Sequence, residues 1–130
     1  MHEVYEFLKS AGTYYLATLE GNQPRVRPFG TIDLYDGRLY IQTGKRKPVA
    51  DQLKANPNIE LSAMLGGRWI RLSAEAVLDD RIEAQTHMLD SYPSLKAMYA
   101  PGDGNTEVYW LRNVTATICS FTAEPEVYQF

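Results

Sequence analysis

The chain has 130 residues, 45% of them hydrophobic and 22% charged, which suits one globular domain with its own core. Its formal charge of −3 argues against a general nucleic-acid or membrane-surface binder. A single cysteine excludes an internal disulfide. With neither an export signal nor an apolar run of membrane-spanning length, we expect a cytoplasmic protein.

Hydrophobic periodicity predicts the elements of the first half of the chain. A short helix is expected over residues 4–12, followed by a strand over residues 13–19. Residues 25–34 alternate over their whole length, which predicts one long strand. Asp36–Gly37 is a strong hairpin signal, and residues 39–43 form the expected return strand.

The second half continues the mixture of strands and short helices. A helix is predicted over residues 48–57, and a second helix begins at Asp80, where Glu83 completes a capping box. A helical turn follows Pro93. The remaining segments read as strands, and they are residues 59–65, 69–78, 107–111, 115–122 and 126–130.

The order of these elements favours a mainly β fold. Seven or eight short strands carry two or three short helices between them, and strands and helices do not alternate regularly. This pattern predicts an antiparallel β-barrel with helical insertions, as a single domain over residues 1–130, in preference to a doubly wound α/β fold.

Charge is distributed unevenly along the chain. Residues 25–47 hold six cations and two anions, whereas the rest of this acidic chain carries a net charge of −7. Three of the cations, Lys45, Arg46 and Lys47, are consecutive. The cluster indicates either a local anion-binding site or a solvated charged surface.

Motifs for several kinds of chemistry are absent. Neither a dinucleotide fingerprint nor a phosphate-binding loop of the G-x-x-x-x-G-K-[ST] type occurs, and two histidines with one cysteine give no metal-ligand spacing. We expect Cys119 to be a packed core thiol and His87 to be exposed without an acidic partner. Side-chain acid–base catalysis therefore has no candidate, so an enzymatic role would depend on a cofactor.

The basic segment pairs with a second one across the predicted hairpin. Arg25 and Arg27 share one strand face, and the return strand brings Thr43 opposite roughly Thr31, with the following lysines beyond it. Converging cations, a hydroxyl and the start of a helix at residue 48 suit a phosphate monoester. A solvated cluster remains the alternative.

The motifs in this order resemble a known family. Residues 13–61, from "TYYLATLEG" through "PRVRPFG" and "TGKRKPVADQL" to "NPNIEL", are similar to the pyridoxamine 5'-phosphate oxidase-like, FMN-binding split-barrel family. The likeness continues through "GGRWIRLSAEAVLDD" and "EVYWL", and is greatest to short members that are flavin reductase-like or nitroimidazole-reducing. It implies a homodimer with FMN bound between the subunits.

The resemblance also implies roles for particular residues. Arg27 matches the arginine that holds the FMN phosphate, while Arg25 is either a helper or an exposed strand residue. The family's commonest lysine position falls on Val49, so the lysine role passes to Lys45 or Lys47. The other implied cofactor contacts are Pro28 and Phe29 along the ring, and Thr43 and Gly44 at the phosphate turn. Trp69 and Arg71 either lie near the ring or belong to an ordinary barrel strand with one half-buried aromatic, and Trp110 either approaches the flavin from the partner subunit or packs in the core or at the dimer interface.

The expected function is therefore an FMN-binding oxidoreductase. It would pass electrons through FMN between a donor, such as a reduced nicotinamide, and a small organic substrate. Pyridoxamine 5'-phosphate oxidase activity itself is not expected, because the sequence ends at "EPEVYQF" without a segment that matches the oxidase's substrate-phosphate residues. The alternatives are a non-catalytic flavin carrier or redox sensor, and a domain that binds a different anion.

Overall fold

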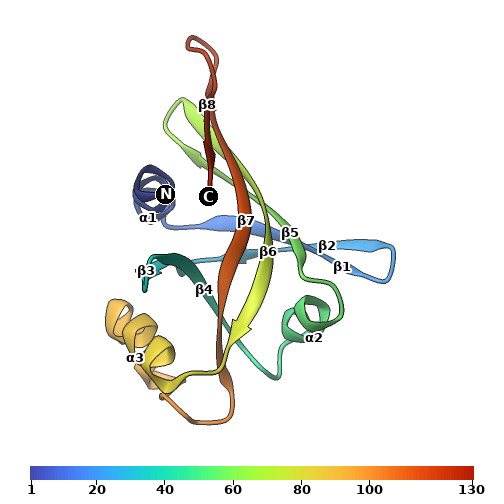
Figure 1. Cartoon of the computed structure of the whole chain (residues 1–130), viewed down its shortest axis with the longest axis vertical. Helices are drawn as coiled ribbons and strands as arrows, with labels where there is room; N and C mark the ends of the chain where they lie inside the picture. The colour runs from blue at the N-terminus through green and yellow to red at the C-terminus, as the bar shows by residue number, and fades with distance from the viewer.

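Eight antiparallel strands make one strongly twisted sheet, with the helices packed against its outer parts (Figure 1). The computed structural model describes all 130 residues. In chain order the elements are α1 (His2–Ala11), β1 (Tyr14–Glu20), β2 (Gln23–Phe29), β3 (Asp33–Tyr35), β4 (Arg38–Gly44), α2 (Pro48–Ala55), β5 (Asn58–Leu65), β6 (Arg68–Asp79), α3 (Ile82–Ser91), the 3-10 helix η1 (Pro93–Ala97), β7 (Thr106–Ser120) and β8 (Glu126–Gln129). The predicted mainly β fold with short helical insertions is confirmed.

The strand order explains how the barrel closes. Along the sheet the strands run β2-β1-β5-β6-β7-β4-β3, and β8 pairs with β7. β2 and β3 are consecutive in the sequence but lie at the two ends of this path. Residues 30–32 join them, so the sheet is closed there by the chain itself and not by a ladder of hydrogen bonds. We call this segment the tether.

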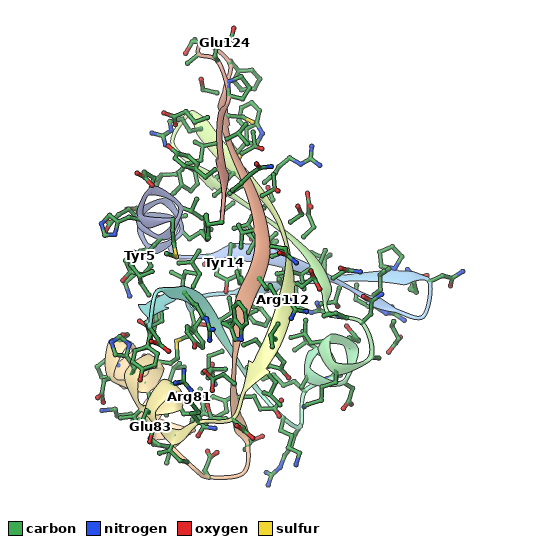
Figure 2. The ribbon with its side chains drawn as sticks, in the orientation of Figure 1. Tyr5, Tyr14, Arg81, Glu83, Arg112 and Glu124 are labelled. Carbon is green, nitrogen blue, oxygen red and sulfur yellow. The ribbon has the colours of Figure 1, made fainter.

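The tether divides the single strand predicted over residues 25–34. β2 pairs with β1 and β3 pairs with β4, while the tether between them belongs to neither ladder. Side chains supply its hydrogen bonds instead. Tyr14, which is labelled in Figure 2, is buried and donates to the carbonyl of Thr31. The Tyr92 hydroxyl both donates to the carbonyl of Ile32 and accepts from its N–H, at 3.0 Å in each case.

β7 is one continuous strand where two were predicted, and it runs through the middle of the molecule in Figure 1. Asn113 has a positive φ of 54°, but the strand does not end there. The register of β6 against β7 shifts between Ser73 and Glu75, and a bulge of this kind absorbs the irregularity. Glu75 accepts hydrogen bonds from Arg112 and Asn113 at 3.0 and 2.6 Å, which holds the two strands together at this point.

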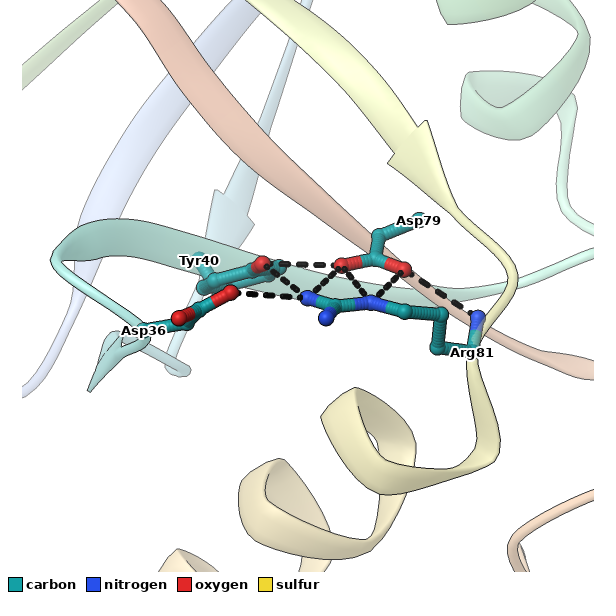
Figure 3. Close-up of polar contacts among 4 residues, drawn as sticks. All are labelled: Asp36, Tyr40, Asp79 and Arg81. Atoms are coloured by element: carbon teal, nitrogen blue, oxygen red, sulfur yellow. Dashed lines mark hydrogen bonds and ion pairs between the residues drawn. The ribbon is translucent and has the colours of Figure 1, made fainter.

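The start of α3 also differs from the prediction. No side chain caps this helix, so the capping box of Asp80 and Glu83 does not form. Arg81 precedes the helix instead, and its guanidinium contacts both carboxylate oxygens of Asp79 at 2.9–3.2 Å (Figure 3). The same guanidinium reaches Asp36 at 3.3 Å and the Tyr40 hydroxyl at 3.4 Å. α3 is therefore fastened to β4 and to the β3–β4 turn.

The main core contains 22 buried side chains between the sheet and α1. α1 is amphipathic, and it places Val4, Phe7 and Leu8 in this core. Each such burial stabilises the fold by about 1.5–3 kcal/mol. A second, smaller cluster lies under α3 and contains Met88. None of the helices combines the length and apolar content needed to cross a membrane.

Candidate functional site

A cleft of about 360 Å³ opens beside the tether. Its walls come from the end of β2, the end of β4, the residues that start α2, and η1. Because β2 and β4 are not paired with each other, no ladder of hydrogen bonds fills the space between them. The volume lies within the range of about 300–1,000 Å³ typical of small-molecule sites.

Arg27 forms one end of this cleft. Its guanidinium donates to the carbonyl of Leu16 at 3.2 Å, to the hydroxyl of Thr18 at 2.8 Å and to the amide oxygen of Gln52 at 2.6 Å. β1 and α2 therefore fix its orientation. Partial burial lowers the pKa of Arg27, and the nearby charge of Arg25 lowers it further. A bound anion would offset both effects.

Lys47 lies at the same end and immediately precedes α2. Its backbone is extended, Pro48 begins the helix, and no side chain caps the first-turn amides. The helix start therefore adds its positive end to the two side-chain cations. Thr43 is buried near the end of β4 and also lines the cleft. This end has the groups that a phosphate requires.

The other predicted lysine points elsewhere. The Lys45 side chain lines a separate cleft of about 260 Å³, together with Asp80 and Glu107. Its backbone N–H donates to the carbonyl of Asn105 at 2.6 Å, which ties this turn to the loop before β7. The chain therefore brings Lys47, and not Lys45, to Arg27.

Gly44, predicted at the phosphate turn, does not line the cleft, but it lies against Tyr99, which does. A Cβ atom there would lie 2.9 Å from the Tyr99 hydroxyl, so a larger residue would displace that ring. The alignment of β4 with the tether differs by one residue from the prediction, which placed Thr43 opposite roughly Thr31. Thr31 lies opposite Gln42, whose backbone N–H donates to the Thr31 hydroxyl at 3.1 Å.

The rest of the cleft is largely apolar. Pro28 and Phe29 line one side of it, as predicted for the ring of a cofactor. The opposite wall was not predicted, and it consists of Tyr92, Ser94, Leu95, Met98 and Tyr99 from η1 and its flanks. Met98 is 69% exposed, which is unusual for a large apolar side chain. In the sequence, the indication of this wall was the short helical turn after Pro93, which carries large apolar residues.

None of the residues lining the cleft is an Asp, Glu, His or Cys. The cleft therefore offers cations, hydroxyls, an amide and aromatic faces, and its groups that could transfer a proton are Lys47, Tyr92 and Tyr99.

Four other predicted residues do not line this cleft within one chain. Arg25 pairs with Glu20 at 2.8 Å in a neighbouring groove. Trp69 packs against Phe121 in a tilted arrangement with ring centroids 5.0 Å apart, and Arg71 pairs with Glu60 at 3.2 Å. Trp110 lies under the guanidinium of Arg38, whose carbon is 4.0 Å from the ring centroid.

Two further expectations need correction. His87 is exposed, as predicted, but it has an acidic partner, because its Nδ1 lies 2.6 Å from a carboxylate oxygen of Asp33. The prediction failed because the two residues are far apart in the sequence and meet only when α3 packs on β3. Cys119 is half-buried and not a fully packed core thiol, since it lies near the outer end of β7.

Comparison with known proteins gives a consistent result. Residues 1–117 match the pyridoxamine 5'-phosphate oxidase family. A solved NimC/NimA family protein from Clostridium acetobutylicum is 44% identical, with a TM-score of 0.97 over 100% of this chain and 92% of that protein. No curated protein matches the sequence significantly.

More distant solved structures share the fold. A putative pyridoxamine 5'-phosphate oxidase from Listeria innocua is 16% identical, with a TM-score of 0.67 over 94% of this chain and 98% of that one. A protein described as an F420 reductase is 18% identical, with a TM-score of 0.61 over 82% and 90% of the two chains.

Proposed function

This chain belongs to the pyridoxamine 5'-phosphate oxidase family, and we propose that it binds FMN in the cleft beside the tether and works as an FMN-dependent oxidoreductase. Proteins of this family commonly bind flavin. The electrons would pass from a donor, such as a reduced nicotinamide, to a small organic substrate.

The observation that carries the proposal is the division of the cleft into two chemically different parts. Arg27 and Lys47 gather at one end, next to the start of α2, whereas Phe29, Tyr92 and Leu95 line the remainder. FMN has the same division, with a phosphate at one end and a planar ring system at the other. Each charge-assisted hydrogen bond to the phosphate contributes about 1.5–3 kcal/mol.

The residues of the chain have distinct tasks in this proposal. Arg27 is already oriented by Thr18 and Gln52, so little conformational freedom is lost when it binds the phosphate. Lys47 adds a second charge from a flexible stem. Pro28 and Phe29 support the ring and exclude water from one side. FMN, when bound, supplies the hydride and one-electron chemistry that the lining side chains lack.

Pyridoxamine 5'-phosphate oxidase activity itself is not part of the proposal. A phosphorylated substrate needs its own cations, and the η1 wall contributes none to the cleft. Lys96, the cation of η1, donates to Asp90 at 2.7 Å and does not line the cleft. We propose an acceptor without a phosphate group.

We further propose that the active unit is a cytoplasmic homodimer with FMN at the subunit interface. Trp69, Arg71 and Trp110 would then contact the cofactor from the second subunit, which agrees with their absence from the lining of the cleft in their own chain.

The first experiment is direct. The purified protein is expected to show visible flavin absorbance, and extraction should release FMN rather than riboflavin. FMN at a hundred times its dissociation constant should stabilise the fold by about 2.7 kcal/mol and raise Tm by several degrees. A colourless protein whose Tm does not respond to FMN would contradict the proposal.

Turnover separates an enzyme from a flavin carrier. Steady-state rates are measured with a reduced nicotinamide and a panel of nitroaromatic, quinone and free-flavin acceptors. An oxidoreductase reduces at least one acceptor catalytically, whereas a carrier or sensor undergoes a single reduction.

A further inference from the structure

A second groove, of about 490 Å³, adjoins the cleft. Three residues line both spaces, and they are Arg27, Lys47 and Val49. The groove continues past them along Arg25, Val26 and Pro48. The phosphate end of the cleft is therefore not a closed pocket, because the two cations that would hold a phosphate also face the groove.

The groove has the charge of an anion site. Arg25, Arg27 and Lys47 supply three cations, and Glu20 is the one acidic residue that lines it. Glu20 pairs with Arg25 at 2.8 Å, but both side chains are half-exposed. An exposed pair of this kind is only weakly stabilising, so a phosphate can compete with Glu20 for Arg25.

The groove also has apolar surface. Pro48 is exposed at the start of α2. The Val26 side chain points to the opposite face of β2 from Arg25 and Arg27, so Val26 borders the groove through its backbone. A proline ring in such a position suits the flat face of a nucleobase. The groove volume lies in the usual range for small ligands, about 300–1,000 Å³.

We propose that this groove binds the second phosphate and the adenosine of a flavin dinucleotide, so that the protein accepts FAD as well as FMN. The inference rests on the proposed flavin site. Arg27 and Lys47 hold the phosphate common to both flavins, Arg25 holds the second phosphate, and the adenine lies against Pro48. A site built for a monoester alone would end at Arg27 and Lys47.

The test compares three flavins and three proteins. Dissociation constants of riboflavin, FMN and FAD are measured by fluorescence titration for the unsubstituted chain, Arg25→Ala and Arg112→Ala. Arg112 is a matched control, because it also forms a surface ion pair, with Glu75, and its side chain is 47% exposed against 50% for Arg25. It lies on β7 and lines neither the cleft nor the groove.

For the unsubstituted chain, the dissociation constant of FAD is expected to lie within about tenfold of that of FMN. Arg25→Ala should weaken FAD about tenfold and FMN less than about threefold, as expected for one lost charge-assisted hydrogen bond. Arg112→Ala should leave both unchanged. FMN binding without FAD binding overturns the inference and leaves the proposed function intact. Equal losses of FMN and FAD in Arg25→Ala also overturn it, because Arg25 would then hold the first phosphate. Failure to bind any flavin refutes both.

Discussion

At the scale of single residues, the cleft depends on an arginine that is already in place. Arg27 donates to three oxygens of β1 and α2, and Gln52 accepts from both Arg27 and Thr18. A guanidinium held in this way loses little freedom when a phosphate binds. Lys47 has no such support, so its contribution is mainly its charge.

The two lysines of the basic cluster should therefore differ in their effect on flavin binding. Lys47→Ala is expected to weaken FMN about tenfold and leave riboflavin nearly unchanged, because only FMN carries the phosphate. Lys45→Ala is the control, since that side chain lines another cleft, and it should change neither constant. Titration with both flavins measures the difference. A larger loss in Lys45→Ala than in Lys47→Ala would contradict this placement of the phosphate.

Sequence reasoning reached part of this site and missed part of it. The "RVRPF" and "TGKRKP" segments drew attention to Arg27 and to Lys45 or Lys47, because basic residues in an acidic chain stand out, and of the two lysines only Lys47 lines the cleft. Gln52 was missed, since its hydrogen bond to Arg27 depends on how α2 packs against β1. Tyr92 and Met98 were missed for the same reason, because η1 reaches the cleft only through tertiary packing.

At the scale of elements, α3 is positioned by the cluster of Asp36, Tyr40, Asp79 and Arg81 (Figure 3). Tyr40 donates to Asp79 at 2.8 Å, and Asp79 is nearly buried. Since η1 follows α3 directly, this cluster also determines where one wall of the cleft stands.

The Asp79 carboxylate should make stability depend on pH. Hydrogen bonds from Arg81 lower the pKa of Asp79 to about 2. The folded state thus favours the ionised form. This contribution, about 2 kcal/mol, is complete above the unfolded pKa of about 3.9 and is lost as pH falls through about 2. Asp79→Asn should therefore lower the free energy of unfolding at pH 7, and the difference should shrink on acidification towards pH 2.

Urea unfolding between pH 7 and pH 2 measures this effect. Asp80→Asn is the matched control, because Asp80 is exposed and makes no hydrogen bond or ion pair. It should change stability by less than about 0.5 kcal/mol. A pH-independent loss in Asp79→Asn would show that the side chain acts through packing alone.

Element boundaries were predictable where turns mark them. β1, β4, β5 and β6 lie within two residues of their predicted bounds, because hairpin turns and the proline before β5 separate them. The tether was not predictable, since residues 25–34 alternate without interruption while their pairing partner changes from β1 to β4. β7 was predicted as two strands, residues 107–111 and 115–122, whereas the strand continues through Arg112 and Asn113.

At the scale of the whole molecule, the prediction concerns assembly. A homodimer with FMN at its interface has a mass of about 29 kDa, twice the 14.7 kDa of the chain. Analytical ultracentrifugation should give this value. Dilution below the dimer dissociation constant should also release flavin, because each site needs two chains. A 14.7 kDa monomer that keeps its affinity for FMN on dilution would contradict the proposed interface.

The fold class was accessible at this scale because it depends on composition and order rather than on particular contacts. Short strands with hairpin turns, interrupted by three short helices, are compatible with few architectures. How the barrel closes, in contrast, depends on which strands pair, and local patterns do not encode that choice.

The tether has a consequence for how such proteins diversify. Two of the walls of the cleft, the ends of β2 and β4, belong to strands that share no hydrogen-bond ladder, so a substitution in β2 places no register constraint on β4. Each wall is free to acquire new side chains independently during evolution. The length of the tether, in contrast, is constrained, because residues 30–32 alone span the gap between the two edges of the sheet. Variation in ligand preference should therefore accumulate as substitutions along the walls, while insertions and deletions at the tether are purged.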